Sequence, residues 1–309
     1  MKAAPAAAFT ELTTQEWRAF IQTVSHYCPH LYLFGGEPFV RRDVVELIRA
    51  AHARRMVTGI NTNGTLLQAR EVELVDSGLD YMIVSLDGPE DIHDAIRSAG
   101  VRGFHTVTES LERCVTAKRA AATRFPLIET CMTLTEDNQA HLLETARIAK
   151  DVGADLFSIQ LGTFTTAVLE AGSSAAFAAD FGSAPGYWRG FVRQTDRIDP
   201  GLIARQLLSV ERMWGRAFKR YPPFPVDLDT YYRRPEVAVR PHRCQAPWSH
   251  MQVLPNGDIA FCEDFPDLIA GNIRDGDALA TWNGARATAF RRRIAETGTY
   301  AACSRCCSP

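Results

Sequence analysis

Residues 31–38 of this 309-residue chain, LYLFGGEP, join a short apolar run to two glycines, a glutamate and a proline. An apolar run that ends in glycine is typical of a buried strand followed by a tight turn. Similar runs recur along the chain, and the expected strands are 31–34, 57–61, 81–86, 127–133 and 156–161. Segments with helical periodicity separate them. Strands that alternate with helices predict repeated βαβ units and a parallel sheet.

Helical periodicity predicts helices over 13–27, 43–55, 71–77, 106–121 and 139–152, and Thr13-x-x-Glu16 is a capping box for the first of them. The alternation stops near residue 165. Residues 202–221 have the pattern of an amphipathic helix, and we interpret 166–240 as a connector or lid. Further on, Asn256-Gly257 lies between the apolar runs 251–254 and 259–261, which predicts a β-hairpin.

The composition is that of a globular protein, with 46% hydrophobic residues and a net charge of −2. Without a basic excess we expect no nucleic-acid partner, and without an apolar run of membrane-spanning length we expect no membrane partner. The basic run Arg291–Arg293 predicts a solvated helix face. The N-terminus lacks the pattern of an export signal, so we expect a cytoplasmic protein with reduced thiols.

The segments that follow the first three expected strands are rich in Gly, Asn and Asp. They are Gly35-Gly36-Glu37, Asn61-Thr62-Asn63-Gly64 and Ser85-Leu86-Asp87-Gly88. Parallel sheets place their chemistry at this edge, where the carboxyl ends of the strands meet. Two glycines let a ligand reach the backbone amides, and Glu37 can accept a hydrogen bond from an ammonium group. The pattern predicts a shared site for an amino-acid-like group, with plain polar loops as the alternative.

Five of the eight cysteines lie near the C-terminus, at positions 244, 262, 303, 306 and 307. Cysteines at two-residue spacing in a protein with reduced thiols predict a metal site rather than disulfides. Four thiolates suit either tetrahedral Zn²⁺ or an iron–sulfur cluster. Cys114 and Cys131 lie in expected helix and strand segments and are predicted to be core thiols.

GGEP at 35–38, NTNGT at 61–65 and SLDGP at 85–89 occur in the order typical of the radical S-adenosylmethionine (SAM) superfamily, which residues 1–165 resemble. The resemblance implies an α/β fold, namely an incomplete parallel (β/α)6-type partial TIM barrel whose first strand is missing. It also implies SAM binding through Gly35, Gly36, Glu37, Asn61, Asn63 and Ser85.

Residues 241–309 resemble the SPASM/twitch extension of that superfamily, through the spacing from Cys244 to Gly257 and Cys262 and the later Cys303-x2-Cys306. The resemblance implies a small domain with one auxiliary [4Fe–4S] cluster. Its ligands would be Cys244, Cys262, Cys303 and Cys306, with Cys307 as a spare. A zinc site stays open as the alternative.

The chain departs from the superfamily in one respect. The Cys-x3-Cys-x2-Cys motif of the catalytic cluster is absent, and Cys28 stands alone before the first expected strand. We therefore assign no catalytic residue, expect SAM binding to be weakened without the catalytic cluster, and expect the chain to be truncated or inactive as given.

The resemblance implies an oxidoreductase or maturase in which a 5′-deoxyadenosyl radical abstracts hydrogen from a peptide or small molecule. It also implies a reducing partner such as flavodoxin or ferredoxin. The alternatives are a non-catalytic peptide-binding homologue and a zinc-stabilised barrel that binds a small molecule.

Overall fold

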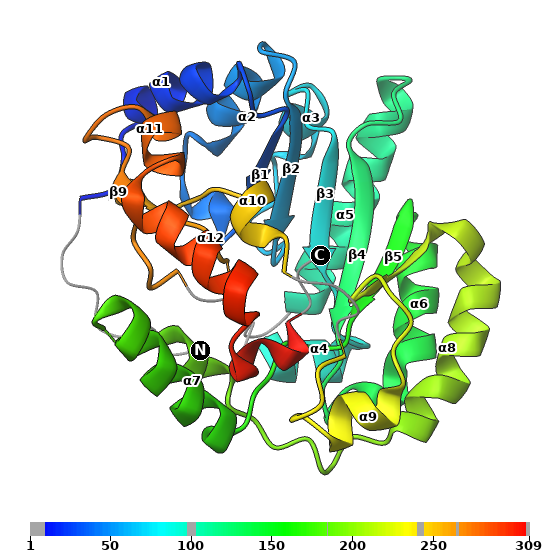
Figure 1. The fold of residues 1–309 in the computed structure, drawn as a ribbon. Helices are drawn as coiled ribbons and strands as arrows, with labels where there is room; N and C mark the ends of the chain where they lie inside the picture. Colours follow the sequence, from blue (N-terminus) through cyan, green and yellow to red (C-terminus); the bar gives the residue numbers. More distant parts are fainter. Residues whose placement is uncertain (1–9, 98–102, 184, 240–243, 264–265, 307–309) are drawn as a thin grey trace. The chain divides into compact units, whose positions relative to one another are not determined.

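The computed structural model describes residues 10–97, 103–183, 185–239, 244–263 and 266–306. The chain divides into two compact units, coloured along the sequence in Figure 1. One unit, here the sheet unit, comprises residues 21–161 and 198–221. The other, here the cysteine unit, comprises residues 1–20, 162–197 and 222–309. The domain boundaries expected from the sequence stay a prediction.

The sheet unit is built on a parallel six-stranded sheet in the order β1-β2-β3-β4-β5-β6. Consecutive parallel strands joined by helices form a partial TIM barrel. This confirms the expected fold class. The strands are β1 (His30–Leu33), β2 (Val57–Thr62), β3 (Tyr81–Ser85), β4 (Leu127–Thr133), β5 (Leu156–Gln160) and β6 (Phe218–Tyr221).

Helices cover one face of this sheet (Figure 1). Alternate residues of the strands point to opposite faces, and one set packs against the helices. Ile60, Met82 and Val84 belong to that set and form a buried core with Ile48 and Leu111 of the helices. The helical segments are α2 (Val44–His52), α3 (Glu71–Val75), α4 (Glu90–Arg97), α5 (Gly103–Ala120), α6 (Leu142–Asp151) and α8 (Pro200–Trp214), with short turns η1 (Pro38–Val40), η2 (Gln139–His141) and η4 (Gly215–Ala217).

The prediction of a helix over 202–221 is wrong at its C-terminal end. Helix α8 ends at Trp214, and the next residue, Gly215, has φ +54, a conformation that glycine adopts without strain. After the turn η4 the chain forms β6, which pairs with β5 from Phe157 to Gln160. A sixth strand, β6, therefore forms the edge of the sheet opposite β1.

The cysteine unit contains a three-stranded antiparallel sheet of β7 (Gln252–Val253), β8 (Asp258–Ala260) and β9 (Gly271–Asn272). Strands β7 and β8 form the predicted hairpin, with Gly257 at φ +91 in its turn. The helical segments of the unit are α7 (Ala167–Phe181), η3 (Tyr187–Phe191), α9 (Leu228–Arg233), α10 (Ala246–Ser249), α11 (Ala278–Trp282), α12 (Ala285–Thr297) and η5 (Ala301–Arg305), and α1 (Thr14–Val24) begins in it.

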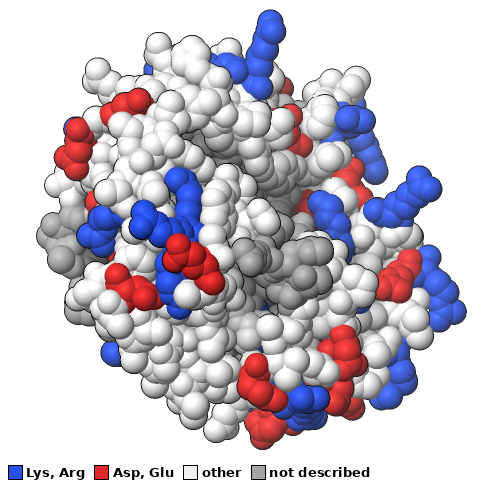
Figure 2. Space-filling model, in the orientation of Figure 1, with Lys and Arg blue, Asp and Glu red and all other residues white. Residues whose placement is uncertain are grey.

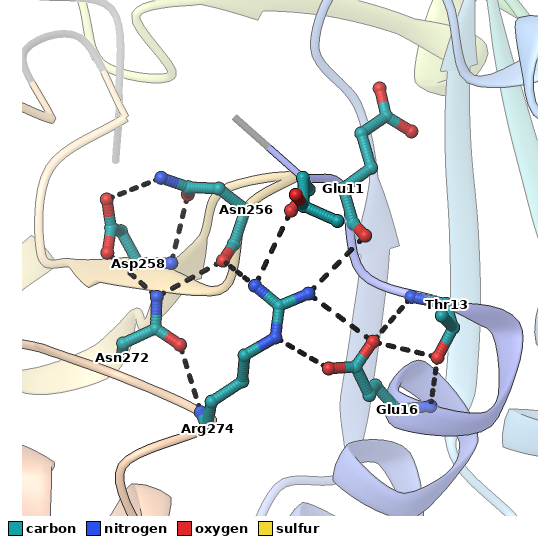
Figure 3. A network of polar contacts seen from close by, with 8 residues as sticks. Glu11, Thr13, Glu16, Asn256, Asp258, Asn272 and Arg274 are labelled. Carbon is teal, nitrogen blue, oxygen red and sulfur yellow. Dashed lines mark hydrogen bonds and ion pairs between the residues drawn. The ribbon is translucent and has the colours of Figure 1, made fainter. Parts of the chain in front are cut away.

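A polar network fastens the N-terminal segment to this hairpin (Figure 3). Arg274 Nε donates to Glu16 Oε1 at 2.6 Å, and its Nη1 donates to the carbonyl oxygen of Asn256 at 3.0 Å. Glu16 also accepts from the backbone N and the hydroxyl of Thr13, which confirms the capping box. These hydrogen bonds lower the pKa of Glu16 to about 2, and the bond from Arg274 has the largest effect.

On the face shown in Figure 2, basic and acidic side chains are interspersed in small groups. No helix among the described residues has both the length and the hydropathy needed to cross a membrane.

Candidate functional site

The loop after β1 leaves backbone open to a ligand. Gly35 has φ +139, a conformation that favours glycine. A Cβ atom added to Gly35 or to Gly36 would meet no atom within 4 Å. Both glycines are exposed, so a ligand can reach their amides without displacing a side chain.

Glu37 fastens the ends of two neighbouring strands. Its Oε1 accepts from Phe39 N at 3.0 Å, which caps η1, and from Thr62 Oγ1 at 2.8 Å. Its Oε2 accepts from Asn63 N at 2.8 Å. The carboxylate therefore ties the loop after β1 to the end of β2, in addition to any ligand that it binds.

The turn after β2 is held by its own side chains. Asn63 Oδ1 accepts from the backbone N of Thr65 at 2.9 Å and from its hydroxyl at 2.7 Å. Gly64 has φ +80, and a Cβ atom there would lie 3.0 Å from Val84 Cγ1. Asn63 is thus placed at the carboxyl end of the sheet by a turn that needs glycine at its next position.

Asp87 joins the ends of β3 and β4 from a buried position. Its Oδ2 accepts from Arg97 Nε at 2.5 Å, and its Oδ1 accepts from Thr133 N at 2.9 Å. The backbone N of Asp87 donates to His93 Nδ1, and its carbonyl accepts from Asn138 Nδ2.

His93 is only 1% exposed, and its Nδ1 accepts from the backbone N of Asp87. Burial lowers its pKa, which favours the neutral ring and leaves Nδ1 as an acceptor.

The sheet face opposite the helices carries several polar side chains among apolar ones such as Ile83 and Leu127. The pairing register brings to this face His30, Asn61, Tyr81, Ser85, Glu129, Cys131, Lys219 and Tyr221. Asn61 and Ser85 are half-buried there. Neither side chain makes a hydrogen bond with another described residue, so both can meet a ligand. This face is here called the open face, because the helices of the sheet unit lie on the other side of the sheet (Figure 1). Together with the strand ends it forms the candidate site.

Glu129 is the buried charge of the open face. Its side chain is 2% exposed, and Oε2 accepts from Lys219 Nζ at 2.6 Å. Its Oε1 is buried without a hydrogen-bond partner among the described residues. An unpaired buried carboxylate oxygen is costly, which favours a ligand that donates to it. The signal in the sequence is a glutamate inside an otherwise uncharged strand.

Two tyrosines flank this carboxylate. Burial, followed by the charge of Glu129, raises the pKa of Tyr81 to about 12. The same two causes raise the pKa of Tyr221. The Tyr81 hydroxyl lies 2.8 Å from His30 Nε2. Both phenols therefore stay protonated at neutral pH and can act as hydrogen-bond donors.

The C-terminal thiols lie in the cysteine unit. Cys244, Cys262 and Cys303 pack against one buried cluster that includes Phe261 and Tyr300. The described cysteines form no disulfide. Their soft donor atoms and common apolar surroundings suit a thiolate-bound metal.

Within the described part of the chain, however, no three Cys, His, Asp or Glu side chains converge as metal ligands. The ligand set Cys244, Cys262, Cys303 and Cys306 thus stays a prediction, and Cys307 lies outside the described residues. Of the two predicted core thiols, Cys114 belongs to the buried core, whereas Cys131 is partly buried on the sheet face opposite the helices. Burial raises the pKa of both thiols to about 12.

Arg305, between Cys303 and Cys306, is a buried side chain that links η5 to neighbouring segments, and the sequence did not indicate this role. It is 0% exposed. Its guanidinium donates to the carbonyl oxygens of Thr230, Tyr231, Arg234 and Val237 at 2.5–2.9 Å. These bonds fix η5, and with it the backbone of both cysteines, against α9 and the loop that follows.

Two family models match the chain. One is described as the radical SAM superfamily and matches residues 7–149, and the other is SPASM, an iron–sulfur cluster-binding domain, over residues 244–307. These matches cover the strand-end segments and the C-terminal cysteines. They lend no support to the expectation that the chain is inactive.

Two curated relatives align with part of the chain. The pre-heme d1 synthase of Dinoroseobacter shibae is 31% identical over 149 residues, which are 48% of this chain and 35% of the relative. The PqqA peptide cyclase of Rhizobium meliloti is 42% identical over 97 residues, 30% of this chain and 25% of the relative. The chain thus spans about a third or less of these proteins.

Among solved structures, Streptococcus suis SuiB bound to S-adenosylmethionine has the same fold, with a TM-score of 0.65 at 17% identity. The match covers 94% of this chain and 63% of that one. SuiB bound to its precursor peptide SuiA matches with a TM-score of 0.61 at 15% identity, over 92% of this chain and 60% of that one. With the strand-end site and the two matching models, this chain belongs to the radical SAM superfamily and carries a C-terminal SPASM iron–sulfur domain.

Proposed function

We propose that this chain forms the SAM-binding sheet and the auxiliary-cluster domain of a radical SAM oxidoreductase that modifies a peptide. The observation that carries the proposal is the open loop at Gly35 and Gly36, next to a polar sheet face. The similarity to a PqqA peptide cyclase and to SuiB in complex with its precursor peptide supports a peptide as the substrate.

The strand-end residues would hold SAM by its amino-acid part. The amides of Gly35 and Gly36 are accessible to a carboxylate, and Glu37 keeps acceptor capacity for an ammonium group beside its three protein donors. Asn61 and Ser85 offer hydrogen-bonding groups on the open face. A catalytic iron–sulfur cluster, whose Cys-x3-Cys-x2-Cys ligand motif this sequence does not contain, would have to pass an electron from a partner such as flavodoxin or ferredoxin to SAM, and the resulting radical would remove a hydrogen atom from the substrate.

The peptide would lie along the open face of the sheet. Glu129 Oε1 would accept from a backbone amide or from a side-chain donor of the peptide, while Lys219 balances the carboxylate charge. The neutral phenols of Tyr81 and Tyr221 would donate to peptide carbonyls. A site with a buried acceptor rejects a substrate that lacks the matching donor, which gives selectivity.

In the cysteine unit, we propose that Cys244, Cys262, Cys303 and Cys306 hold one auxiliary [4Fe–4S] cluster. Four thiolates are a complete ligand set for such a cluster. The fixed position of η5, which carries two of them, supports this assignment.

Anaerobic reconstitution of the chain with iron and sulfide tests the proposal. We expect about four iron and four sulfide per chain, together with binding of S-adenosylmethionine in equilibrium dialysis. Replacing both Cys303 and Cys306 by Ala is expected to abolish iron binding, whereas replacing Cys114, which lies in the sheet unit, is expected to leave it unchanged. One zinc per chain with no sulfide would contradict the cluster, and no binding of S-adenosylmethionine would contradict the assignment of the strand ends.

The alignment with a pre-heme d1 synthase favours a second substrate class, a tetrapyrrole precursor. Fluorescence titration of the reconstituted chain with a porphyrin separates the two classes. Saturable quenching of tryptophan fluorescence at micromolar porphyrin, lost in the Glu129→Leu variant, would favour the tetrapyrrole over the peptide.

A further inference from the structure

The side chains next to Glu129 on the open face leave its second carboxylate oxygen unsatisfied. In the strand pairing Glu129 lies opposite Ile83 of β3 and Leu156 of β5. Along β4, Leu127 and Cys131 flank it on the same face. The three aliphatic side chains have no donor, and a thiol is only a weak one. The buried Oε1 therefore needs a donor from outside these strands.

The charges of the open face leave a negative balance around this carboxylate. Lys219 Nζ lies 2.6 Å from Oε2 and balances Glu129 itself. Asp80, directly before β3, adds a second negative charge, which also contributes to the raised pKa of Tyr81. The alternation of side chains along β6 turns Arg220 to the other face. A ligand that brings a positive charge would restore the balance.

Two phenols supply further acceptors. The Tyr81 hydroxyl lies 2.8 Å from His30 Nε2 and can accept another hydrogen bond besides that contact. The half-buried Tyr221 hydroxyl makes no hydrogen bond with another described residue. The Tyr81 ring is fixed in place, because it stacks on Tyr32 with the ring centroids 6.0 Å apart and lies where a Cβ atom of Gly59 would be. Aromatic rings and phenol oxygens next to a carboxylate suit a cation with several donors.

We propose that Glu129 selects a basic side chain of the substrate peptide, whose ammonium group donates to Glu129 Oε1 and to the phenol oxygens of Tyr81 and Tyr221. This rests on the proposed function, in which the open face receives a peptide. Because Oε1 is buried, the basic group enters as the Lys219 side chain, which is 44% exposed, moves aside. Lys219 is thus the counter-ion of the carboxylate in the absence of substrate.

The test is equilibrium dialysis of the full chain, without iron or SAM, against two pools of capped nonapeptides. Both pools have random neutral residues around a fixed central position, which is lysine in one pool and norleucine in the other. Norleucine keeps the apolar stem of lysine and lacks its ammonium group. We expect the chain to bind the lysine pool about tenfold more tightly, because a hydrogen bond between charged groups is stronger than a neutral contact.

Three variants test the role of the carboxylate. Glu129→Gln keeps the shape of the side chain and removes its charge, so the preference for lysine should fall to about twofold or less. Lys219→Met removes the competing cation and should bind the lysine pool about threefold more tightly than the wild type. Glu112→Gln is the matched control, because it removes an exposed carboxylate from α5 and should keep the preference.

Near-ultraviolet circular dichroism shows whether each variant is folded. If Glu129→Gln is not, the double variant with Lys219→Gln replaces it, since that variant leaves no ammonium group without its partner. The preference for lysine should be lost in the double variant as well.

Equal binding of the two pools by the wild type would overturn the selection of a basic side chain, and so would a preference that persists in Glu129→Gln or is lost in Glu112→Gln. Binding of the lysine pool that does not rise in Lys219→Met would overturn the exchange with Lys219. These results would leave the peptide on the open face. If neither pool binds, the peptide itself is overturned as the occupant of this face, and the role of Glu129 with it.

Discussion

Replacing Glu37 should destabilise the sheet unit even in the absence of SAM. The resemblance to the superfamily assigns Glu37 to the ligand, but its carboxylate also accepts three hydrogen bonds from the protein, from Phe39 N, Thr62 Oγ1 and Asn63 N. A net hydrogen bond contributes about 0.5–1.5 kcal/mol, so Glu37→Ala should cost about 2–4 kcal/mol. Glu37→Gln can keep the bonds of Oε1 but places an N–H group against Asn63 N, and it should cost about 1–2 kcal/mol.

The measurement is hydrogen exchange followed by mass spectrometry on the chain without SAM or iron. The amides of Phe39 and Asn63 lose their acceptor in Glu37→Ala, so the peptides that contain them should exchange roughly ten- to a hundredfold faster. Glu73→Gln is the matched control, because Glu73 forms only an exposed pair with Arg49 at 3.3 Å. Exchange that is unchanged in Glu37→Ala would refute the structural role and leave Glu37 as a ligand-binding residue alone.

Three further predictions concern buried charges. Lys219→Met leaves the buried Glu129 carboxylate without its cation and should lower the free energy of urea unfolding by about 1–3 kcal/mol. The cost is moderate because the Lys219 side chain is 44% exposed, so water already screens the pair. The double variant with Glu129→Leu should recover most of the loss. The pKa of His93 is lowered in the folded state, so the unfolded chain binds its proton first. Stability should therefore fall as the pH drops below about 6.5, and thermal unfolding of His93→Asn should show less of this fall. Arg305→Met removes four hydrogen bonds to backbone carbonyl oxygens, one of them buried and three partly buried, and should cost about 4 kcal/mol. Urea unfolding in which Arg305→Met matches the wild type would contradict the structural role of Arg305.

Most of the sheet could be predicted from the sequence because its first five strands are apolar runs bounded by glycine and polar turns. Strand β6 could not, since Phe218–Tyr221 is four residues long with two basic side chains and directly follows a helix. It becomes a strand only because β5 offers it a parallel edge, and that contact joins residues about 60 positions apart.

The residues of the candidate site also divide into those that could be predicted from the sequence and those that could not. The strand-end motifs are local, so Gly35, Glu37 and Asn63 could be named from the sequence. The Glu129–Lys219 pair joins residues 90 positions apart. Arg291 was expected on a solvated helix face, but it is half-buried, with its Cζ atom 4.2 Å from the ring centroid of Trp282 and 5.1 Å from that of Phe261. Such partners are set by the fold, and a run of three arginines looks the same whether or not an aromatic ring covers one of them.

The residues of the strand-end motifs bond the protein itself as well as any ligand, so their presence in the sequence does not by itself indicate ligand binding. Glu37 and Asp87 each bond the backbone of a neighbouring loop or strand, and Asn63 bonds the backbone of its own turn, so stability alone would retain them in a protein that had lost SAM binding. Gly36 is different, because a Cβ atom there would meet nothing and the residue has no positive φ. Gly36→Ala should therefore leave thermal unfolding unchanged but weaken S-adenosylmethionine binding by roughly tenfold in equilibrium dialysis, since a methyl group would lie where the ligand approaches the backbone. Unchanged binding in this variant would contradict a close approach of the ligand to the backbone at Gly36.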